Sequence, residues 1–120
     1  MFDQLDFVYL PSRDAAADVA RYERLGGECV FAIERFGTRV AMVRLTEGGP
    51  GLLLAEHLEG DAPILVFRVD SLTAVDEPGT QFEMPFGFGV ELELPGPQRI
   101  AVYEATRRER GESLTGRRDF

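Results

Sequence analysis

The sequence contains a single cysteine, Cys29, and it has no tryptophan, lysine or asparagine among its 120 residues. One thiol excludes a disulfide framework, a cysteine-rich zinc site and a dithiol redox pair, because each of these needs at least two. No apolar run approaches the roughly 20 residues that cross a bilayer, and Met1 leads into Asp3 and Asp6 rather than into a basic segment. We therefore expect a cytoplasmic protein with no membrane partner.

Positive charge is scarce as well. Thirteen arginines stand against 21 acidic residues, and the formal net charge is -8. A surface with this balance repels polyanions, which argues against nucleic acid or an anionic membrane as a partner and favours a neutral or cationic ligand. The length suits one compact domain that can bury a core of its own.

The first half of the sequence has the pattern of a βαβββ unit. Asp14 is placed to cap a helix, and Gly26-Gly27 is placed to end it. Runs of β-branched and aromatic residues predict the strands around this helix. The predicted elements are a strand over 5–10, a helix over 15–25, strands over 29–36 and 39–45 joined through Gly37-Thr38, and a strand over 52–55.

The second half repeats this pattern with a deletion. Asp70-Ser71 is a plausible cap, but Pro78-Gly79 cuts the second helix short. When one half is laid on the other, Phe7 falls on Ile64, and Leu53 falls on Ala101 once the deletion is allowed for. The predicted elements are strands over 64–69, 81–84, 90–94 and 99–103, with a short helix from residue 72 to residue 75.

These patterns divide the chain into a single domain over 1–107 and a charged tail over 108–120. Module one covers 4–58 and module two covers 61–107. The tail has no apolar period, so one expectation is a solvated extension of the domain. The alternative is that Phe120 and the neighbouring arginines dock on the body or on a second subunit.

The stretch FVYLPSRDAAADVARYERLGG resembles the opening strand and helix of the vicinal oxygen chelate superfamily, which includes glyoxalases, bleomycin-resistance proteins and dioxygenases. ILVFRVDSL and PGPQRIAVYEATR resemble the opening and closing strands of its second module, so the resemblance covers about residues 5–107. It implies an α+β fold in which two βαβββ modules form a cup-shaped, curved mixed sheet with helices outside. It also implies a homodimer.

In metal-dependent members of this superfamily, His, Gln or Glu side chains from the first and last strand of each module hold the cation. The resemblance places these positions at Phe7, Leu53, Ile64 and Ala101, none of which can coordinate a metal. A slip of the alignment by one residue brings in only Asp6. We therefore expect no metal and no cofactor, which puts metal-dependent lyase, dioxygenase and epimerase chemistry in doubt.

The usual nucleophile and base residues are also poorly placed. His57 is the only histidine and follows Glu56 directly, and adjacent strand residues point to opposite faces and cannot easily share one ion. We expect it to be an exposed loop histidine. Cys29 lies inside an apolar strand, and the sequence has no Gly-x-Ser-x-Gly elbow.

Alternation along the strands predicts what lines the cup. Leu65 and Phe67, with Val8, Ile100 and Val102, are expected to pack under the helices. An apolar and aromatic pocket suits a planar or amphipathic small molecule, although the same pattern also suits a plain core. The expected ligand-binding residues in the cup are Phe7, Tyr9, Leu53, Ile64, Val66, Arg68, Ala101 and Tyr103.

Two further features are candidates for the site. Glu83 and Glu91 are the carboxylates that could reach the pocket, where burial of a carboxylate would let it act as a general base, although most such residues face water. Phe86 and Phe88 alternate with Gly87 and Gly89 in a segment where members of the superfamily close over the ligand. The alternative for this segment is a β-bulge with two core phenylalanines.

Three functions remain open from the sequence. The first is a metal-free binding protein for a cationic or aromatic drug-like molecule, similar to the bleomycin-resistance members of the superfamily. The second is an enzyme of the same fold that uses a pocket carboxylate without a metal. The third is an accessory or interaction domain whose cup is filled by its own side chains.

Overall fold

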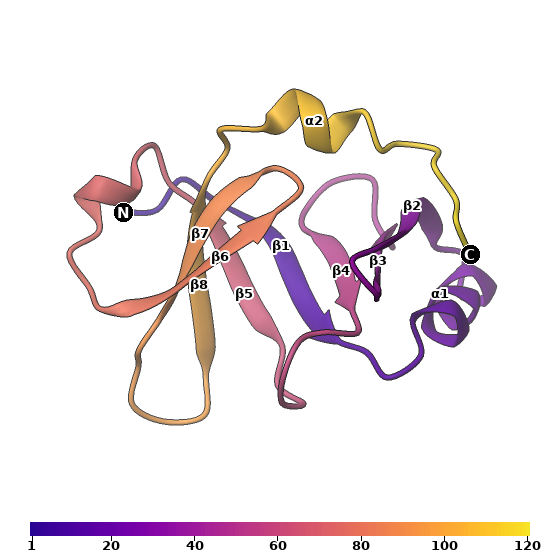
Figure 1. Cartoon of the computed structure of the whole chain (residues 1–120), viewed down its shortest axis with the longest axis horizontal. Coiled ribbons are helices and arrows are strands. Elements are labelled where there is room, and N and C mark those ends of the chain that lie inside the picture. The colour runs from indigo at the N-terminus through magenta and orange to yellow at the C-terminus, as the bar shows by residue number, and fades with distance from the viewer.

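Eight strands form one curled mixed sheet in the computed structural model, which describes residues 1–120 (Figure 1). The strands are β1 (Gln4–Pro11), β2 (Glu28–Arg35), β3 (Thr38–Arg44), β4 (Gly51–Ala55), β5 (Ile64–Arg68), β6 (Gly79–Met84), β7 (Gly87–Leu92) and β8 (Arg99–Glu104). The helical segments are α1 (Ala15–Arg24), the 3-10 turn η1 (Leu72–Ala74) and α2 (Arg108–Glu112). None of these segments is long and apolar enough to cross a membrane.

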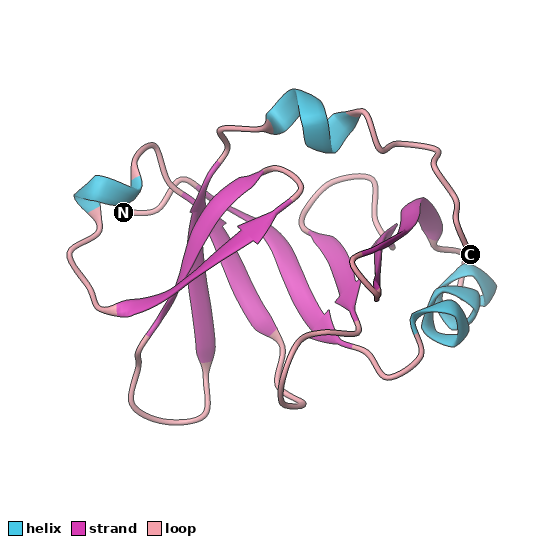
Figure 2. Cartoon of the chain, in the orientation of Figure 1, coloured by secondary structure: helices cyan, strands magenta, loops and turns pink.

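The strand order is β2-β3-β4-β1-β5-β8-β7-β6, so each module contributes one half of the sheet. Within each module the first and last strands pair in parallel, β1 with β4 and β5 with β8. The two modules meet where β1 pairs with β5 in antiparallel fashion. Figure 2 shows the resulting half-barrel, which confirms the predicted α+β class and the curved mixed sheet.

Three predicted elements are wrong in detail. The strand expected over 90–94 is β7, which begins at Gly87, so Phe88 belongs to a regularly paired strand and not to a β-bulge. The helix expected over 72–75 is only the 3-10 turn η1, where the Ser71 hydroxyl accepts a hydrogen bond from the Thr73 amide. So short a segment forms too few backbone hydrogen bonds to offset the free-energy cost of helix nucleation. The first hairpin turns at Phe36-Gly37 rather than at Gly37-Thr38, because Arg35 and Thr38 are still paired across the two strands.

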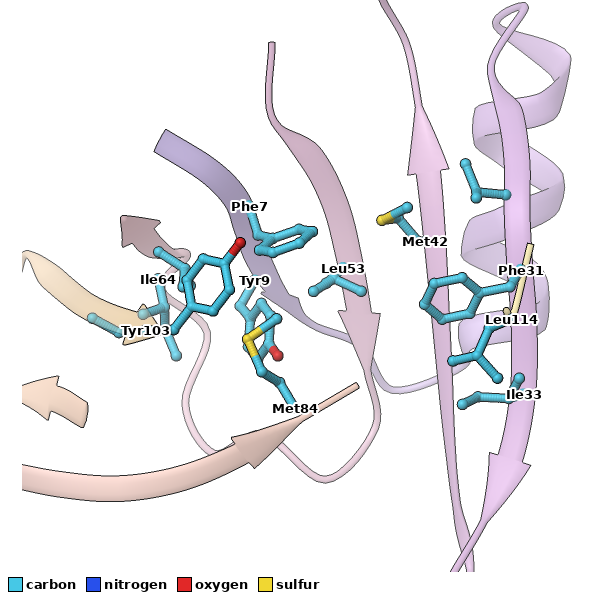
Figure 3. Packing of buried hydrophobic residues seen from close by; sticks show 13 residues of the cluster. Phe7, Tyr9, Phe31, Ile33, Met42, Leu53, Ile64, Met84, Tyr103 and Leu114 are labelled. Atoms are coloured by element: carbon cyan, nitrogen blue, oxygen red, sulfur yellow. The ribbon is translucent and has the colours of Figure 1, made fainter. Parts of the chain in front are cut away.

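The concave face of the sheet is a continuous apolar core (Figure 3). Alternation puts every second residue of β1, β5 and β8 on this face, as predicted, whereas a register shift in β2 places the adjacent Val30 and Phe31 there together. The cluster consists of Phe7, Tyr9, Val30, Phe31, Ile33, Met42, Leu53, Ile64, Val66, Met84, Ala101, Tyr103 and Leu114. The cup is therefore filled at its centre by the protein's own side chains.

The convex face of module two is only partly covered, by η1 against β8 and by Phe2 against Phe67, and an α-helix covers the convex face only in module one. There α1 packs its Val19 against Ala32, Ala41, Val43 and Leu54 of the sheet. The expectation that helices cover both modules is wrong, because η1 is too short to cover the second. Leu65 is consequently 36% exposed, although the neighbouring Val102 is fully buried.

The tail over 108–120, called the strap from here on, docks on the body of the same chain. It crosses the cup as α2 and then runs along β2, where the Ala32 amide donates to the Arg117 carbonyl and the Asp119 amide donates to the Ala32 carbonyl. Leu114 joins the concave core, and Phe120 packs against the α1 cluster on the other face. The docked alternative for the tail is therefore the one observed.

Candidate functional site

The four positions that correspond to metal ligands in the superfamily lie in the concave core. Phe7, Leu53, Ile64 and Ala101 are between 0% and 7% exposed and belong to one apolar cluster. No group of three or more His, Cys, Asp or Glu side chains lies close enough together to hold a metal ion. A divalent cation needs several oxygen or nitrogen donors, so this donor set does not fit the cation that metal-dependent members hold.

Two cavities open on the concave side, and the strap contributes to both. Cavity one has a volume of about 440 Å³ and cavity two about 300 Å³. Cavity one is lined by Tyr9, Ile33, Arg35, Phe36, Thr38, Val40, Leu53, Ala55, His57, Glu83, Met84, Pro85, Arg107, Arg110, Ser113 and Leu114. Cavity two is lined by Gln4, Asp6, Phe7, Val30, Met42, Arg44, Gly49, Gly51, Arg68, Phe86, Tyr103, Arg108, Glu112 and Thr115.

The floor of cavity one is apolar except for the hydroxyl of Tyr9. This side chain comes from β1 and is 7% exposed. Its oxygen has no hydrogen-bond partner within the protein, and no fully buried side-chain oxygen of the molecule lacks one, so this oxygen is not fully buried. Because Tyr9 lines cavity one, the hydroxyl is accessible from that cavity. Burial raises the pKa of Tyr9, with a smaller contribution from Tyr103. The hydroxyl therefore stays protonated at neutral pH and is free to donate a hydrogen bond.

The rim of cavity one is basic. Arg107 donates from Nη1 to Glu83 Oε1 at 2.7 Å, and its guanidinium lies 4.2 Å above the centre of the Phe88 ring. Arg35 and Arg110 also line the cavity, and no carboxylate in the structure forms an ion pair with either of them. The rim thus offers two guanidinium groups whose hydrogen-bond donors are not taken up by acidic side chains.

An aromatic side chain stands at the mouth of cavity one in an unusual conformation. Phe36 is fully exposed and has a φ of 52°, in the left-handed region, and Gly37 follows with a φ of 75°. Two positive φ values in a row are typical of the hairpin turn that favours Asn-Gly. A bulky residue in the first position is strained and gains no burial within the chain.

Four polar groups of cavity two, those of Gln4, Asp6, Arg68 and Tyr103, are already paired with each other. The Tyr103 hydroxyl donates to Asp6 Oδ2 at 2.5 Å, and Arg68 Nε lies 3.7 Å from the same carboxylate oxygen. Burial raises the pKa of Tyr103, and the Asp6 carboxylate raises it further because the phenol is its donor. The rings of Phe7 and Phe86 pack beside this network with 5.1 Å between their centres.

The predicted ligand-binding residues are distributed among four places. Tyr9 and Leu53 line cavity one. Those that line cavity two are Phe7, Arg68, Phe86 and Tyr103. Ile64, Val66 and Ala101 lie in the core and line neither cavity. Phe88 also lines neither, because it is paired with Glu104 on the convex face, where it is 42% exposed.

The two predicted carboxylates are separated by the fold. Glu83 lies at the rim of cavity one, where its side chain is 62% exposed. Glu91 lines neither cavity and is held by Arg99, with Nη2 and Oε1 separated by 2.8 Å. His57 is exposed as expected, and it also lines cavity one, where its Nδ1 lies 3.2 Å from the Thr38 hydroxyl.

Most residues that line cavity one escaped the sequence-based prediction, and four of them matter for its rim and its cover. Arg35 and Phe36 come from the β2-β3 turn, and Arg110 and Leu114 come from the strap. The only local signal was a phenylalanine before Gly37 at a turn that favours asparagine. Nothing in the charge pattern of the strap indicates that it reaches the cup.

No family model matches the sequence, and no curated protein matches it either. Solved structures do match. One is methylmalonyl-CoA epimerase from Mycobacterium tuberculosis, with a TM-score of 0.66 and 18% identity over 88% of this chain and 89% of that chain. Another is described as an NAD-dependent benzaldehyde dehydrogenase from Legionella pneumophila, with a TM-score of 0.55 and 24% identity over 83% of this chain and 98% of that one.

At such low identity these matches show the fold and not the activity. The epimerase is a member of the vicinal oxygen chelate superfamily. The paired βαβββ modules and the curled eight-stranded sheet described above agree with that match. The chain therefore has the vicinal oxygen chelate fold.

Proposed function

We propose that the protein binds a small amphipathic molecule in cavity one without the help of a metal ion. The observation that carries this proposal is the cavity itself, whose volume of about 440 Å³ lies within the range of small-molecule sites. Its apolar floor can take up the body of a ligand, and its few polar groups, Tyr9 among them, can orient it. The proposal does not involve the centre of the cup, which is filled.

The strained turn of the β2-β3 hairpin supports the same proposal. Phe36 exposes its whole side chain to water at the mouth of the cavity, which costs free energy in the unliganded chain. An apolar ligand in the cavity would give this ring a surface to cover. Residues that keep an unfavourable backbone conformation are concentrated at functional sites.

An enzyme of the same fold is the second candidate, because Glu83 and His57 line the cavity that Tyr9 also faces. These groups could accept or donate protons around one bound molecule. Against this, Glu83 is ion-paired with Arg107 at the exposed rim. A bound compound that is recovered unchanged after incubation with the protein would support binding alone, and conversion that is lost in Glu83→Gln would support catalysis.

A thermal-shift screen of planar aromatic compounds tests the proposal, because a ligand that binds the native state raises its melting temperature. Two strap variants locate the binding. Ser113→Trp places a large ring in cavity one, and Thr115→Trp places the same ring in cavity two. We expect compounds that stabilise the wild type to lose their effect in Ser113→Trp and to keep it in Thr115→Trp.

Two results would contradict the proposal. If hits lose their effect only in Thr115→Trp, the ligand site is cavity two. If no compound shifts the melting temperature of any variant, the third reading is favoured, in which a filled cup serves as an accessory domain. The homodimer and the cytoplasmic location stay predictions, and light scattering on the purified protein tests the dimer.

A further inference from the structure

The charges around cavity one have the opposite sign to the net charge of the chain. The protein as a whole carries -8. Three arginines, Arg35, Arg107 and Arg110, nevertheless line cavity one against a single carboxylate, Glu83. That carboxylate is already paired with Arg107. The cavity therefore presents two guanidinium groups without an acidic partner inside an acidic protein.

For a bound molecule the local charges outweigh the distant ones. Charges separated by more than about 8–10 Å are largely screened at physiological salt, so the ligand is influenced mainly by the groups that line its cavity. Two carboxylates in the neighbouring segments have arginine partners of their own, whereas Glu109 and Glu112 of the strap have none. Glu34 pairs with Arg39, and Asp119 pairs with Arg117. The argument from net charge, which favours a cationic ligand, therefore does not hold at this site.

We infer that the ligand of cavity one is an organic anion with an apolar body, such as an aryl or alicyclic carboxylic acid; this inference rests on the proposed function. The apolar part lies over Tyr9 and Leu53 and is covered by Phe36. The acid group lies at the rim within reach of Arg35 and Arg110, because a guanidinium matches the geometry of a carboxylate with two parallel hydrogen bonds.

The Tyr9 hydroxyl adds a second requirement. It is a donor at the apolar floor with no acceptor inside the protein. A ligand that displaces water from the cavity and offers no acceptor costs the Tyr9 hydroxyl the hydrogen bond that it makes to water in the open cavity. We therefore expect tighter binding from acids that carry a carbonyl or ether oxygen at the end remote from the carboxylate.

Three matched probes test the charge of the ligand in isothermal titration calorimetry: 2-naphthylacetate, 2-naphthylacetamide and 2-(2-naphthyl)ethylamine. They share one ring system and carry a negative, a neutral and a positive end. We expect the acid to bind about tenfold more tightly than the amide, as a charge-assisted hydrogen bond at an exposed rim allows. The amine should bind most weakly, and added salt should weaken only the acid.

Variants of single arginines assign the effect to the rim. Arg110→Gln and Arg35→Gln should each reduce the ratio of acid affinity to amide affinity and leave the affinity for the amide unchanged. Arg108→Gln is the matched control, because Arg108 lies on the same strap and lines cavity two instead. The ratio of acid affinity to amide affinity in Arg108→Gln should equal that of the wild type.

The outcomes separate this inference from the proposed function. Equal binding of acid and amide, or tighter binding of the amine, overturns the anionic class and leaves the binding function in place. A ratio that changes in Arg108→Gln but in neither rim variant overturns the assignment to cavity one. If none of the three probes binds and the screen of aromatic compounds also finds no ligand, the proposed function and the inference fail together.

Discussion

Module one and module two share one strand order but differ in what covers them. On the convex face of module one, α1 buries Val43 and Leu54 almost completely. On the convex face of module two, η1 covers little and Leu65 is left 36% exposed. The strap widens the difference, because it leaves the last strand of module two and adds Leu114 and Phe120 to the packing of module one.

The comparison shows that a repeated strand pattern does not make two modules equally stable. Burial of apolar surface is the main favourable term in folding. Module one receives an α-helix that module two lacks, whereas the strap contacts both modules, since it also lines cavity two beside Phe86 and Tyr103. We expect the regions of lowest local stability to lie in module two, where strand faces meet water. The cavity that we propose as the ligand site, in contrast, is built mainly on module one and the strap.

The largest expected effect comes from truncating one leucine on each convex face. Leu54→Ala should lower the free energy of unfolding by about 2–5 kcal/mol, because it leaves a void under α1. Leu65→Ala should lower it by less than about 1 kcal/mol, because this side chain is partly exposed already. Urea unfolding measures both. Equal losses would mean that something outside this chain covers the face of module two.

A smaller effect is expected from the helix caps. Asp14 accepts a hydrogen bond from the Ala17 amide at the start of α1, and Ser71 does the same for Thr73 at the start of η1. Asp14→Ala should lower the free energy of unfolding by about 1 kcal/mol, the usual value for the loss of an N-cap. Ser71→Ala should lower the free energy of unfolding by much less than Asp14→Ala does, since η1 contributes little packing. Thermal unfolding of the two variants checks this order, and a larger loss in Ser71→Ala would contradict it.

The smallest effect concerns the pH dependence of the strap. Hydrogen bonds from Arg118 lower the pKa of Glu23, and hydrogen bonds from the Arg117 side chain and the Glu34 amide lower that of Asp119. A carboxyl whose pKa is lower in the folded state contributes stability above its unfolded pKa of about 4. That contribution is lost as the pH falls through the folded value.

We therefore expect the strap to loosen in acid before the sheet does. The protection of the Gly116 and Asp119 amides, which donate to β2, should fall below about pH 4 while amides within β1 stay protected. Amide exchange, corrected for its intrinsic pH dependence, measures this. Glu23→Gln should remove part of the dependence, and an unchanged profile in that variant would show that the Glu23–Arg118 pair does not hold the strap.

Much of the fold follows from local sequence patterns. The period of α1, its Asp14 cap and the alternating strands are local features, and all of them are found near the predicted positions. The β6-β7 hairpin was predicted less well, because β7 was expected to begin at Val90 and begins at Gly87. Alternation within the observed strand explains Phe88. A strand residue next to a concave position must face the convex side, and the paired glycines Gly87 and Gly89 occupy the concave positions.

The candidate site was predictable only in part. Tyr9 and Leu53 follow from the alternation of β1 and β4. Arg110 and Leu114 do not, because the strap is placed by tertiary contacts with β2 rather than by any period of its own. The sign of the charge in cavity one was missed for the same reason. Net charge averages over the whole surface, whereas the cavity gathers arginines from segments distant in sequence.

The position of the strap after all eight strands has a consequence for the order in which the fold can be completed. Every strand of the cup is synthesised before residues 108–120, and the cover of the concave face is the last part of the described chain to emerge. Until residues 108–120 are in place, the sheet lacks the segment that covers its concave side. Closure of the two cavities therefore requires a segment that follows every strand of the sheet in the sequence.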